Sequence, residues 1–336
     1  TLSGSETYQW RKDGVDLVDG GHISGATSPI LVLSGVAEGD SGSYTVVVTN
    51  ASGSTASEPA LLSLWSADDG SLSNLSTRGQ VLSGNDILIA GFVLAGSESK
   101  TLLIRGIGPS LGQFVGQDKA LEDSTLAVYS GGVEILSNDD WSGQDVVDLS
   151  AQVGAFALDE GSKDAVIRAD LSAGAYSALV AGKSNNGLGL VELYDGSADS
   201  DSKLRNISTR GRVGVGDSIM VPGLVVTENS RRLLIRGVGP ELAESFGFNP
   251  EDVLPDPVLT LVDVDNSEVA TNDNWSEGAD ADMIATVAQQ VGAFALTDGS
   301  ADAAILLAVP AGVYTAQVSD ADGSEGIAIV EVYAAP

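Results

Sequence analysis

The feature that most constrains this chain is an internal duplication. The stretch NLSTRGQVLSGNDILIAGFVL at residues 74–94 returns as NISTRGRVGVGDSIMVPGLVV at residues 206–226, an offset of 132 residues. The motif LLIRGIGPSL at 102 returns as LLIRGVGPEL at 233, and QVGAFAL begins at both 152 and 290. Because the motifs keep their order while their spacing drifts, we expect the two copies to share one fold and to differ in their loops.

Each copy has the texture of short strands. Apolar or alternating runs such as DILIAGFVLAG and KTLLIRGIG stand between clusters of Gly, Ser, Asn and Asp, which is typical of strands bounded by turns. About eight such runs fall in roughly 130 residues, a density typical of an antiparallel sandwich or jelly roll. The exception is DADMIATVAQQVGAF, where Met283, Ile284, Val287 and Val291 recur at helical spacing and predict a short amphipathic helix. We therefore expect two tandem jelly-roll-like β-sandwich modules, each with one short helix.

The charge balance narrows the set of partners. The chain has 47 acidic and 16 basic residues, for a formal net charge of −31. Nucleic acids and anionic membranes both require basic patches, so we expect neither as a partner. The absence of cysteine excludes disulfides and thiolate metal sites. No apolar run approaches the ~18 residues of a membrane span, and no leader peptide is evident at the first residues, so we expect a mature or excised piece of a larger protein.

Residues 1–64 follow a different pattern. Trp10 ends an alternating run, and Asp40, Gly42 and Tyr44 form a D-x-G-x-Y motif that leads into the alternating strand 44–50. This segment resembles an immunoglobulin-like domain, in which a strand-C tryptophan is buried and a tyrosine corner opens strand F. The resemblance implies structural roles for Trp10, Asp40 and Tyr44. Val46 stands where such domains carry their second cysteine.

The same segment contains GDSG, the string around the nucleophile of trypsin-like proteases. That chemistry needs a histidine to activate the serine and a third residue to orient it. The only histidine is His22, in a turn-rich stretch. We therefore interpret Ser41 as structural.

The immunoglobulin-like pattern lacks its first strands, because only a few residues precede TYQW. Half a sandwich exposes an unpaired strand edge and an apolar face. Two explanations stay open. The chain is cut within the domain, or the missing strands come from another chain by β-strand addition.

Residues 70–336 resemble a repeat found near the C-terminal ends of very large secreted bacterial surface proteins. The motifs that carry the resemblance are STRG, LLIRGxGP, NDxW, VGAF and the closing VELYD or VEVYA. The hairpins around AGAYSALV and AGVYTAQV are also similar to pre-peptidase C-terminal jelly rolls. These resemblances imply display outside the cell, or on the bacterial cell surface, without catalysis.

Four arginines recur at matching positions in a chain that has few cations. They are either ligands for carboxylates or acidic sugars, because a guanidinium binds planar anions in a bidentate manner, or salt-bridge partners of module aspartates, for example in the NDxW turn. The four are Arg78, Arg105, Arg210 and Arg236.

The NDxW loops offer the candidate metal ligands. Asp139 and Asp140 precede Trp141, and Asp273 stands in the second copy before Asn274 and Trp275. Calcium takes six to eight carboxylate, amide or carbonyl oxygens, so it is the cofactor these loops could hold. Asx residues are equally common in plain turns, and the two tryptophans are expected to be structural anchors.

The predicted organisation is therefore an immunoglobulin-like domain lacking its first strands at 1–64, a linker at 65–70, repeat 1 at 71–196, a linker at 197–203 and repeat 2 at 204–336. We expect a non-enzymatic structural segment of a bacterial extracellular filament, fibre or adhesive stalk, which self-associates through its modules and through strand donation into the first domain. The alternative is a carbohydrate- or calcium-binding accessory module of a large secreted enzyme.

Overall fold

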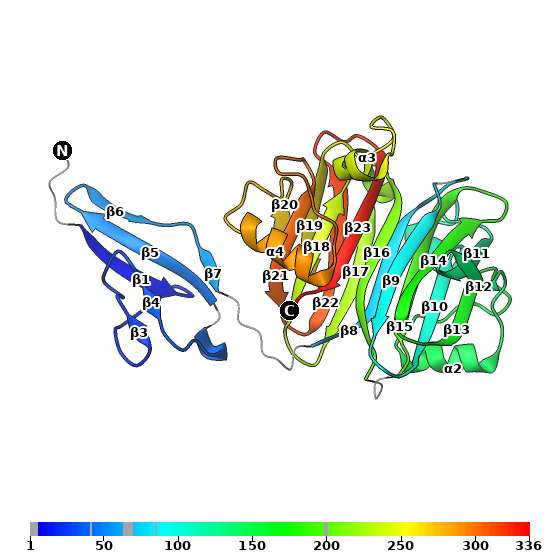
Figure 1. The fold of residues 1–336 in the computed structure, drawn as a ribbon, viewed down its shortest axis with the longest axis horizontal. Helices are drawn as coiled ribbons and strands as arrows, with labels where there is room; N and C mark the ends of the chain where they lie inside the picture. The colour runs from blue at the N-terminus through cyan, green and yellow to red at the C-terminus, as the bar shows by residue number, and fades with distance from the viewer. Residues whose placement is uncertain (1–5, 41, 63–69, 85, 198–200) are drawn as a thin grey trace. The chain divides into compact units, whose positions relative to one another are not determined.

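The computed structural model describes residues 6–40, 42–62, 70–84, 86–197 and 201–336, so the interpretation of Ser41 lies outside the described residues. Contacts divide the chain into two compact units, Thr1–Ala67 and Asp68–Pro336, which we treat separately. Strands dominate both units (Figure 1), and the expected all-β fold class is confirmed. None of the described helices combines the length and the apolar character needed to cross a bilayer.

The first unit is built on one antiparallel sheet in the order β2-β1-β5-β6, with β7 also paired to β5. A separate two-stranded ladder joins β3 and β4. The elements are β1 (Thr7–Lys12), β2 (Val15–Asp16), β3 (Ile23–Ser24), β4 (Val32–Leu33), the 3-10 turn η1 (Glu38–Asp40), β5 (Gly42–Asn50), β6 (Gly53–Ala56) and β7 (Ala60–Leu62).

The tyrosine corner of the immunoglobulin pattern is present. The Tyr44 hydroxyl donates to the Asp40 carbonyl at 2.7 Å, and the Tyr44 side chain is buried. The Asp40 carboxylate accepts a bond from the Ala37 amide at 2.8 Å and lies 2.6 Å from His22. These bonds, the Ala37 amide foremost, lower the pKa of Asp40. Asp40 and Tyr44 therefore fix the entry to β5.

Trp10 pairs with Val46 across the β1–β5 ladder, and its indole donates to the Ser28 carbonyl at 2.9 Å. It is only partly buried. Among the described side chains of this unit, the buried residues are Ala26, Asp40 and Tyr44. The unit is thus a sheet with a thin second layer.

The second unit contains both repeats, and equivalent strands appear in each. Repeat 1 supplies β8 (Ser71–Val81), β9 (Leu88–Ala95), β10 (Lys100–Ile107), β11 (Ser124–Ser130), β12 (Val133–Asn138), β13 (Ala165–Leu171), β14 (Gly174–Gly182) and β15 (Gly187–Asp195). Repeat 2 supplies β16 (Lys203–Val213), β17 (Val221–Thr227), β18 (Arg231–Val238), β19 (Pro257–Asp263), β20 (Glu268–Asn272), β21 (Ala303–Val309), β22 (Gly312–Asp320) and β23 (Gly326–Ala334).

Within each repeat the strands form two four-stranded layers. In repeat 1 these are β8-β15-β10-β13 and β9-β14-β11-β12. Repeat 2 has the same order in β16-β23-β18-β21 and β17-β22-β19-β20. The first strand pairs with the eighth and the second with the seventh, which is the jelly-roll arrangement of two Greek keys.

Where the two repeats meet, the inner strands of each repeat pair with inner strands of the other. β8 of repeat 1 pairs with β17 of repeat 2, and β16 of repeat 2 pairs with β9 of repeat 1. Both layers therefore run without interruption through the two repeats (Figure 1), and one hydrophobic core extends across the junction. The compact unit contains both repeats. The separate domain limits 71–196 and 204–336 remain predictions from the sequence.

The junction has an approximate two-fold relation between equivalent residues. Thr77 and Thr209, both fully buried, are hydrogen-bonded through their hydroxyls at 2.8 Å. β8 and β16 also bridge directly, at Gln80 and Arg212, and these positions are again 132 residues apart. A Cβ at Gly211 would lie 2.9 Å from the Met220 Cε and 3.0 Å from the Leu88 Cδ1, so the glycine leaves room for two core side chains.

Each repeat contains a second helical segment besides the one short helix expected, and repeat 2 also contains the 3-10 turn η3 (Gly216–Ser218). The expected helix of repeat 2 is α4 (Ala281–Val291), and α2 (Gln144–Gln152) is its counterpart in repeat 1. The GxGP motifs begin η2 (Pro109–Leu111) with α1 (Gly112–Val115) in repeat 1 and α3 (Pro240–Phe246) in repeat 2. Proline suits the first turn of a helix because its fixed φ is already helical and its missing N–H is not needed there.

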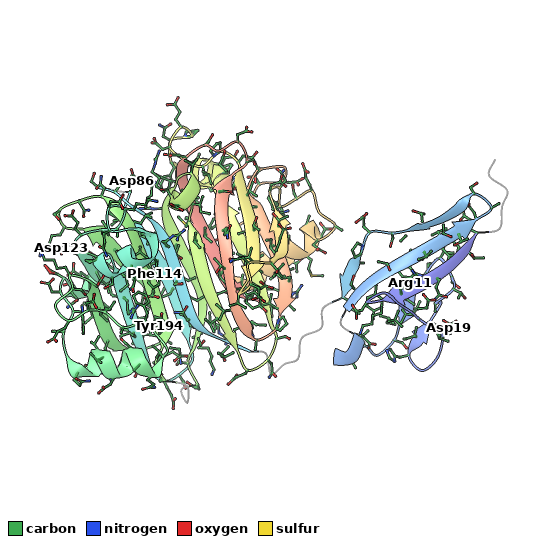
Figure 2. The ribbon with its side chains drawn as sticks, turned by 180° about the vertical axis from the view of Figure 1, so that it is seen from behind. Arg11, Asp19, Asp86, Phe114, Asp123 and Tyr194 are labelled. Atoms are coloured by element: carbon green, nitrogen blue, oxygen red, sulfur yellow. The ribbon has the colours of Figure 1, made fainter. Side chains whose placement is uncertain are left out.

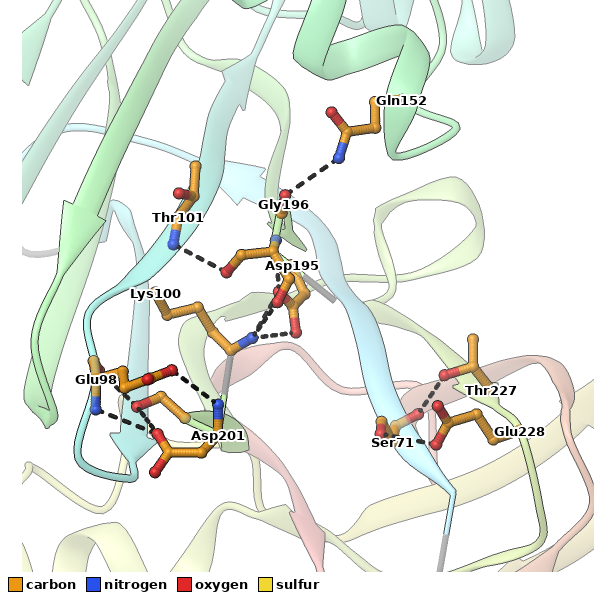
Figure 3. A network of polar contacts seen from close by, with 12 residues as sticks. Ser71, Glu98, Lys100, Thr101, Gln152, Asp195, Gly196, Asp201, Thr227 and Glu228 are labelled. Carbon is orange, nitrogen blue, oxygen red and sulfur yellow. Dashed lines mark hydrogen bonds and ion pairs between the residues drawn. The ribbon is translucent and has the colours of Figure 1, made fainter. Parts of the chain in front are cut away.

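The described residues on either side of 198–200 are bonded to the β9–β10 turn and to the start of β10 (Figure 3). Lys100 is fully buried and donates to both Asp195 oxygens at 2.7 and 2.6 Å. Asp201 accepts bonds from the Ser97 hydroxyl at 2.6 Å and the Glu98 amide at 3.2 Å. β15, which pairs with β8, and β16, which pairs with β9, therefore lie in different layers.

We expect the threonine pair to stabilise the junction. Thr77→Val leaves the buried Thr209 hydroxyl without this partner and should cost about 1–3 kcal/mol. The double variant Thr77→Val/Thr209→Val should cost clearly less than twice the single effect. Urea unfolding measures both, with exposed Thr271→Val as the control, and strictly additive costs would contradict the pairing.

Candidate functional site

A buried arginine lies at the same place in each repeat. The Arg105 Nε donates to Glu192 at 2.8 Å and its Nη1 to the Phe156 carbonyl at 2.7 Å. The Arg236 Nε donates to Glu331 at 2.7 Å and its Nη1 to the Phe294 carbonyl at 2.6 Å. Both guanidinium groups are fully buried and lie 4.3 Å from the phenylalanine ring centroids.

This geometry joins three of the sequence motifs. RGxGP supplies the arginine, VGAF the phenylalanine, and VELYD or VEVYA the glutamate. Arg105 faces Glu192 directly across the β10–β15 ladder, and Arg236 faces Glu331 across β18–β23. One of the two alternatives paired the arginines with module aspartates, for example from NDxW. For Arg105 and Arg236 that partner was wrong, because the strand register places a glutamate opposite each arginine.

A tyrosine completes each pair. The Tyr194 hydroxyl donates to Glu192 at 2.8 Å, and the Tyr333 hydroxyl donates to Glu331 at the same distance. Burial, with the adjacent glutamate, raises the pKa of both tyrosines well above the ordinary value. Both phenols are therefore fixed hydrogen-bond donors.

Two buried aspartates hold the GxGP turns, and sequence reasoning missed them. Asp164 accepts bonds from the Gly108 amide at 2.8 Å and the Ser110 hydroxyl at 2.5 Å. Its counterpart Asp302 accepts from the Gly239 amide at 2.8 Å. Burial raises the pKa of Asp302. The signal available was their matching place in GSKDA and GSADA, at the start of a buried strand.

The NDxW loops close the outer ends of the sandwich. The Asn138 side chain on β12 accepts a bond from the Val166 amide on β13 at 2.9 Å, and Asn272 accepts from the Ala304 amide at 2.8 Å. These bonds connect edge strands of the two layers. The Trp141 and Trp275 amides each donate to the carbonyl of the buried aspartate, Asp164 or Asp302, at 2.9 Å.

The other two arginines, Arg78 and Arg210, lie at the junction of the repeats instead of in the buried ion pairs. Arg78 is partly buried, and burial lowers its pKa. Its Nε has no hydrogen-bond partner among the described residues. The Arg210 guanidinium lies 5.5 Å from the Phe248 ring centroid. The nearby ion pair between Lys119 and Asp217, at 2.6 Å, connects repeat 1 to repeat 2.

Asp139 and Asp140 of repeat 1 come together with a third carboxylate, Asp123. One oxygen from each lies within 4.8 Å of the others. Figure 2 labels Asp123 at the margin of the unit. Lysines already bind two members, Lys163 on Asp123 at 2.7 Å and Lys183 on Asp139 at 2.5 Å. Asp123 is 6% exposed, and its Oδ1 has no hydrogen-bond partner among the described residues.

The corresponding region of repeat 2 differs in charge. Asp273 is exposed there. Burial, together with the charges of Asp320, Asp273 and Asp322, raises the pKa of Asp256. The positions of Lys163 and Lys183 carry Ala301 and Ala321 in repeat 2. The two loops thus share their backbone bonds, but only repeat 1 has lysines at these two positions to neutralise the carboxylates.

The comparisons with known proteins add little. No family model and no curated protein matches the chain. A solved structure, "Sidekick-1 immunoglobulin domains 1-5", is 12% identical and covers 97% of this chain and 73% of its own, with a TM-score of 0.16. At that score the likeness carries no structural argument.

We expect the Arg–Glu pairs to be structural. Arg236→Met leaves Glu331 buried without its counter-ion and should cost about 3–5 kcal/mol. Adding Glu331→Gln should recover part of that loss, because the uncompensated charge is removed. Chemical denaturation measures both variants, with exposed Arg205→Met as control. Equal stability of Arg236→Met and the control would refute the assignment.

Proposed function

We propose that this chain is a non-catalytic structural segment of a bacterial extracellular filament, fibre or adhesive stalk. The observation that carries the proposal is the use of the recurring motif residues to bind the repeats' own strands and loops together. Arg105 and Arg236 are fully buried in ion pairs and are closed to an external anion. The resemblance of the motifs to repeats of large secreted surface proteins supports the location outside the cell.

The first unit supplies the surface for assembly in this proposal. Its sheet has a thin second layer, and Ile30 and Val32, beside and within β4, are 71% and 49% exposed. A short ladder with exposed apolar side chains suits an added strand, because main-chain bonds provide affinity and alternate side chains enter the apolar face. The donor would be a strand of another copy or of a neighbouring module.

Electron microscopy and light scattering of the purified chain test this proposal. We expect filaments or a regular oligomer, and removal of residues 1–64 should abolish it. Val32→Lys should also weaken assembly, since the added strand would bury a charge. The matched control is Val313→Lys on β22, where the valine is 50% exposed. A chain that stays monomeric at all concentrations would exclude the proposal.

A second candidate function is calcium binding at Asp123, Asp139 and Asp140. The buried, unpaired Oδ1 of Asp123 favours it, because burying a carboxylate oxygen without a partner is costly and a divalent cation would relieve that cost. Lys163 and Lys183 compete with the cation, since their ammonium groups already bind Asp123 and Asp139. Their hydrogen bonds to these carboxylates raise the pKa of both lysines.

If calcium binds there, it should stabilise the folded chain by about 2–3 kcal/mol at a hundredfold its dissociation constant. Asp140→Asn should abolish that gain, and Lys163→Met should tighten binding by removing the competitor. Thermal unfolding with calcium and with chelator, together with calorimetric titration, measures this. Exposed Asp159→Asn is the control, and an unchanged melting temperature in calcium would reject the candidate.

A further inference from the structure

One layer of repeat 1 has an outer face with no charge at its centre. β9, β14 and β11 are neighbouring strands of this layer, with β12 on one side and β16 on the other (Figure 1). Their sequences, LIAGFVLA, GAYSALVAG and STLAVYS, contain no charged residue, although the chain has a formal net charge of −31. A second negatively charged chain therefore meets little repulsion over these three strands.

Two rows of side chains, with one member from each strand, form this outer face. The rows are Ala127, Leu179, Ile89 and Tyr129, Ser177, Gly91. All six residues are partly exposed, whereas the residue between the two rows is fully buried on each strand. Both rows therefore point away from the core, and we call these six residues the β14 face. The helix of the repeat, α2, packs on β10 and β13 of the other layer.

The two strands that border the β14 face differ in charge. β16 (KLRNISTRGRV) contains four basic residues, all at least partly exposed, and no acidic residue. β12 contains the exposed Glu134 and leads into the exposed Asp140. β14 lies midway between the two strands, so a two-fold axis parallel to β14 lays β16 of one copy over β12 of another. Opposite charges then meet at both margins of the contact, which favours this orientation over others.

We propose that the β14 face binds the β14 face of a second copy of this chain, with the two sheets stacked about that axis. The small side chains of Ala127 and Ser177, with Gly91, allow the ~10 Å spacing of stacked sheets. Five strands about 4.8 Å apart, each about seven residues long, present roughly 500–600 Å² per copy. Stable complexes bury about 800 Å² per partner, so one such contact is weak. Contacts between chains that are already in a row reinforce one another. This lateral role rests on the proposed function as a filament or fibre.

The corresponding face of repeat 2 lacks the features that favour the contact. Leu179 corresponds to Gln317 and Ala127 to Thr260, at matching places in the strand ladders. The strand that borders this second face, β8, has one basic residue, Arg78, where β16 has four. We therefore assign the contact to repeat 1 alone.

Cross-linking of the full chain tests the contact. The chain has no cysteine, so a single introduced thiol is unique. Ser177→Cys lies within the β14 face, and Thr315→Cys is the matched control at the equivalent, also partly exposed position of repeat 2. With a short bismaleimide at one protein concentration, we expect Ser177→Cys to form cross-linked dimers at least tenfold faster than the control. Equal rates would overturn the proposal.

Second substitutions in the Ser177→Cys chain locate the contact. Leu179→Gln introduces the residue that repeat 2 carries at this position, so the fold should accept it, and it should slow cross-linking several-fold. Leu179→Lys should slow it to the rate of the control, and Glu134→Lys, which sets like charges against β16, should slow it several-fold. Gln317→Lys should leave the rate unchanged. If these chains all react alike, the contact lies elsewhere and the assignment is refuted.

Electron microscopy of the same samples separates this contact from the filament. Filaments combined with equal cross-linking rates of the two cysteine variants would leave the proposed function standing and overturn the β14 contact. Fast cross-linking of Ser177→Cys in a chain that forms no filament would support the contact and exclude the filament.

Discussion

The pairing of strands between the two repeats at their junction is the interaction on which the second unit depends. β8 and β9 of repeat 1 have their partners in β17 and β16 of repeat 2. Without this exchange each repeat would present two unpaired inner edges and an open end of its apolar core, a combination that soluble β proteins avoid. The outer ends are closed by other means, since Asn138 and Asn272 connect the edge strands of the two layers. The repeat is thus the unit of sequence, whereas the pair is the unit that buries a complete core.

The buried arginines perform a second, local task. The long crossing loops of each repeat pack in small apolar clusters apart from the main core, such as the one that contains Trp275, Ile284 and Val287. Arg105 and Arg236 connect these loops to the sheets, because each guanidinium bonds a strand glutamate on one side and a loop carbonyl on the other. Asp164 and Asp302 hold the neighbouring GxGP turns through backbone amides. A buried charge pair often contributes little net stability, so we infer that the directional bonds of these pairs serve to specify one arrangement of the loops.

Much of this arrangement was predictable from sequence, for physical reasons. The duplication, the short alternating runs and the helical spacing of Met283 to Val291 are local patterns, and they predicted the all-β class and α4. The tyrosine corner at Tyr44 could be predicted because its motif spans few residues. The register between distant strands carries no such local signal, so the pairing of Arg236 with Glu331 and the exchange between repeats could not be derived. Asp164 and Asp302 escaped notice because aspartate in a polar turn usually faces solvent.

The crossing of β8 and β16 also bears on the order of events as the chain folds. Gln80 meets Arg212 there, so two copies of repeat 2 would bring arginine against arginine, while two copies of repeat 1 would bring together uncharged amides. Chains generally fold from the N-terminal end during synthesis. The β8 and β9 edges of repeat 1 then stay unpaired until residues 203–227 have been synthesised. Because repeat 1 has Gln80 where repeat 2 has Arg212, no charge at this position opposes its pairing with a second copy of repeat 1. We therefore expect mispairing between two chains to be easiest after repeat 1 has been synthesised and before repeat 2 follows.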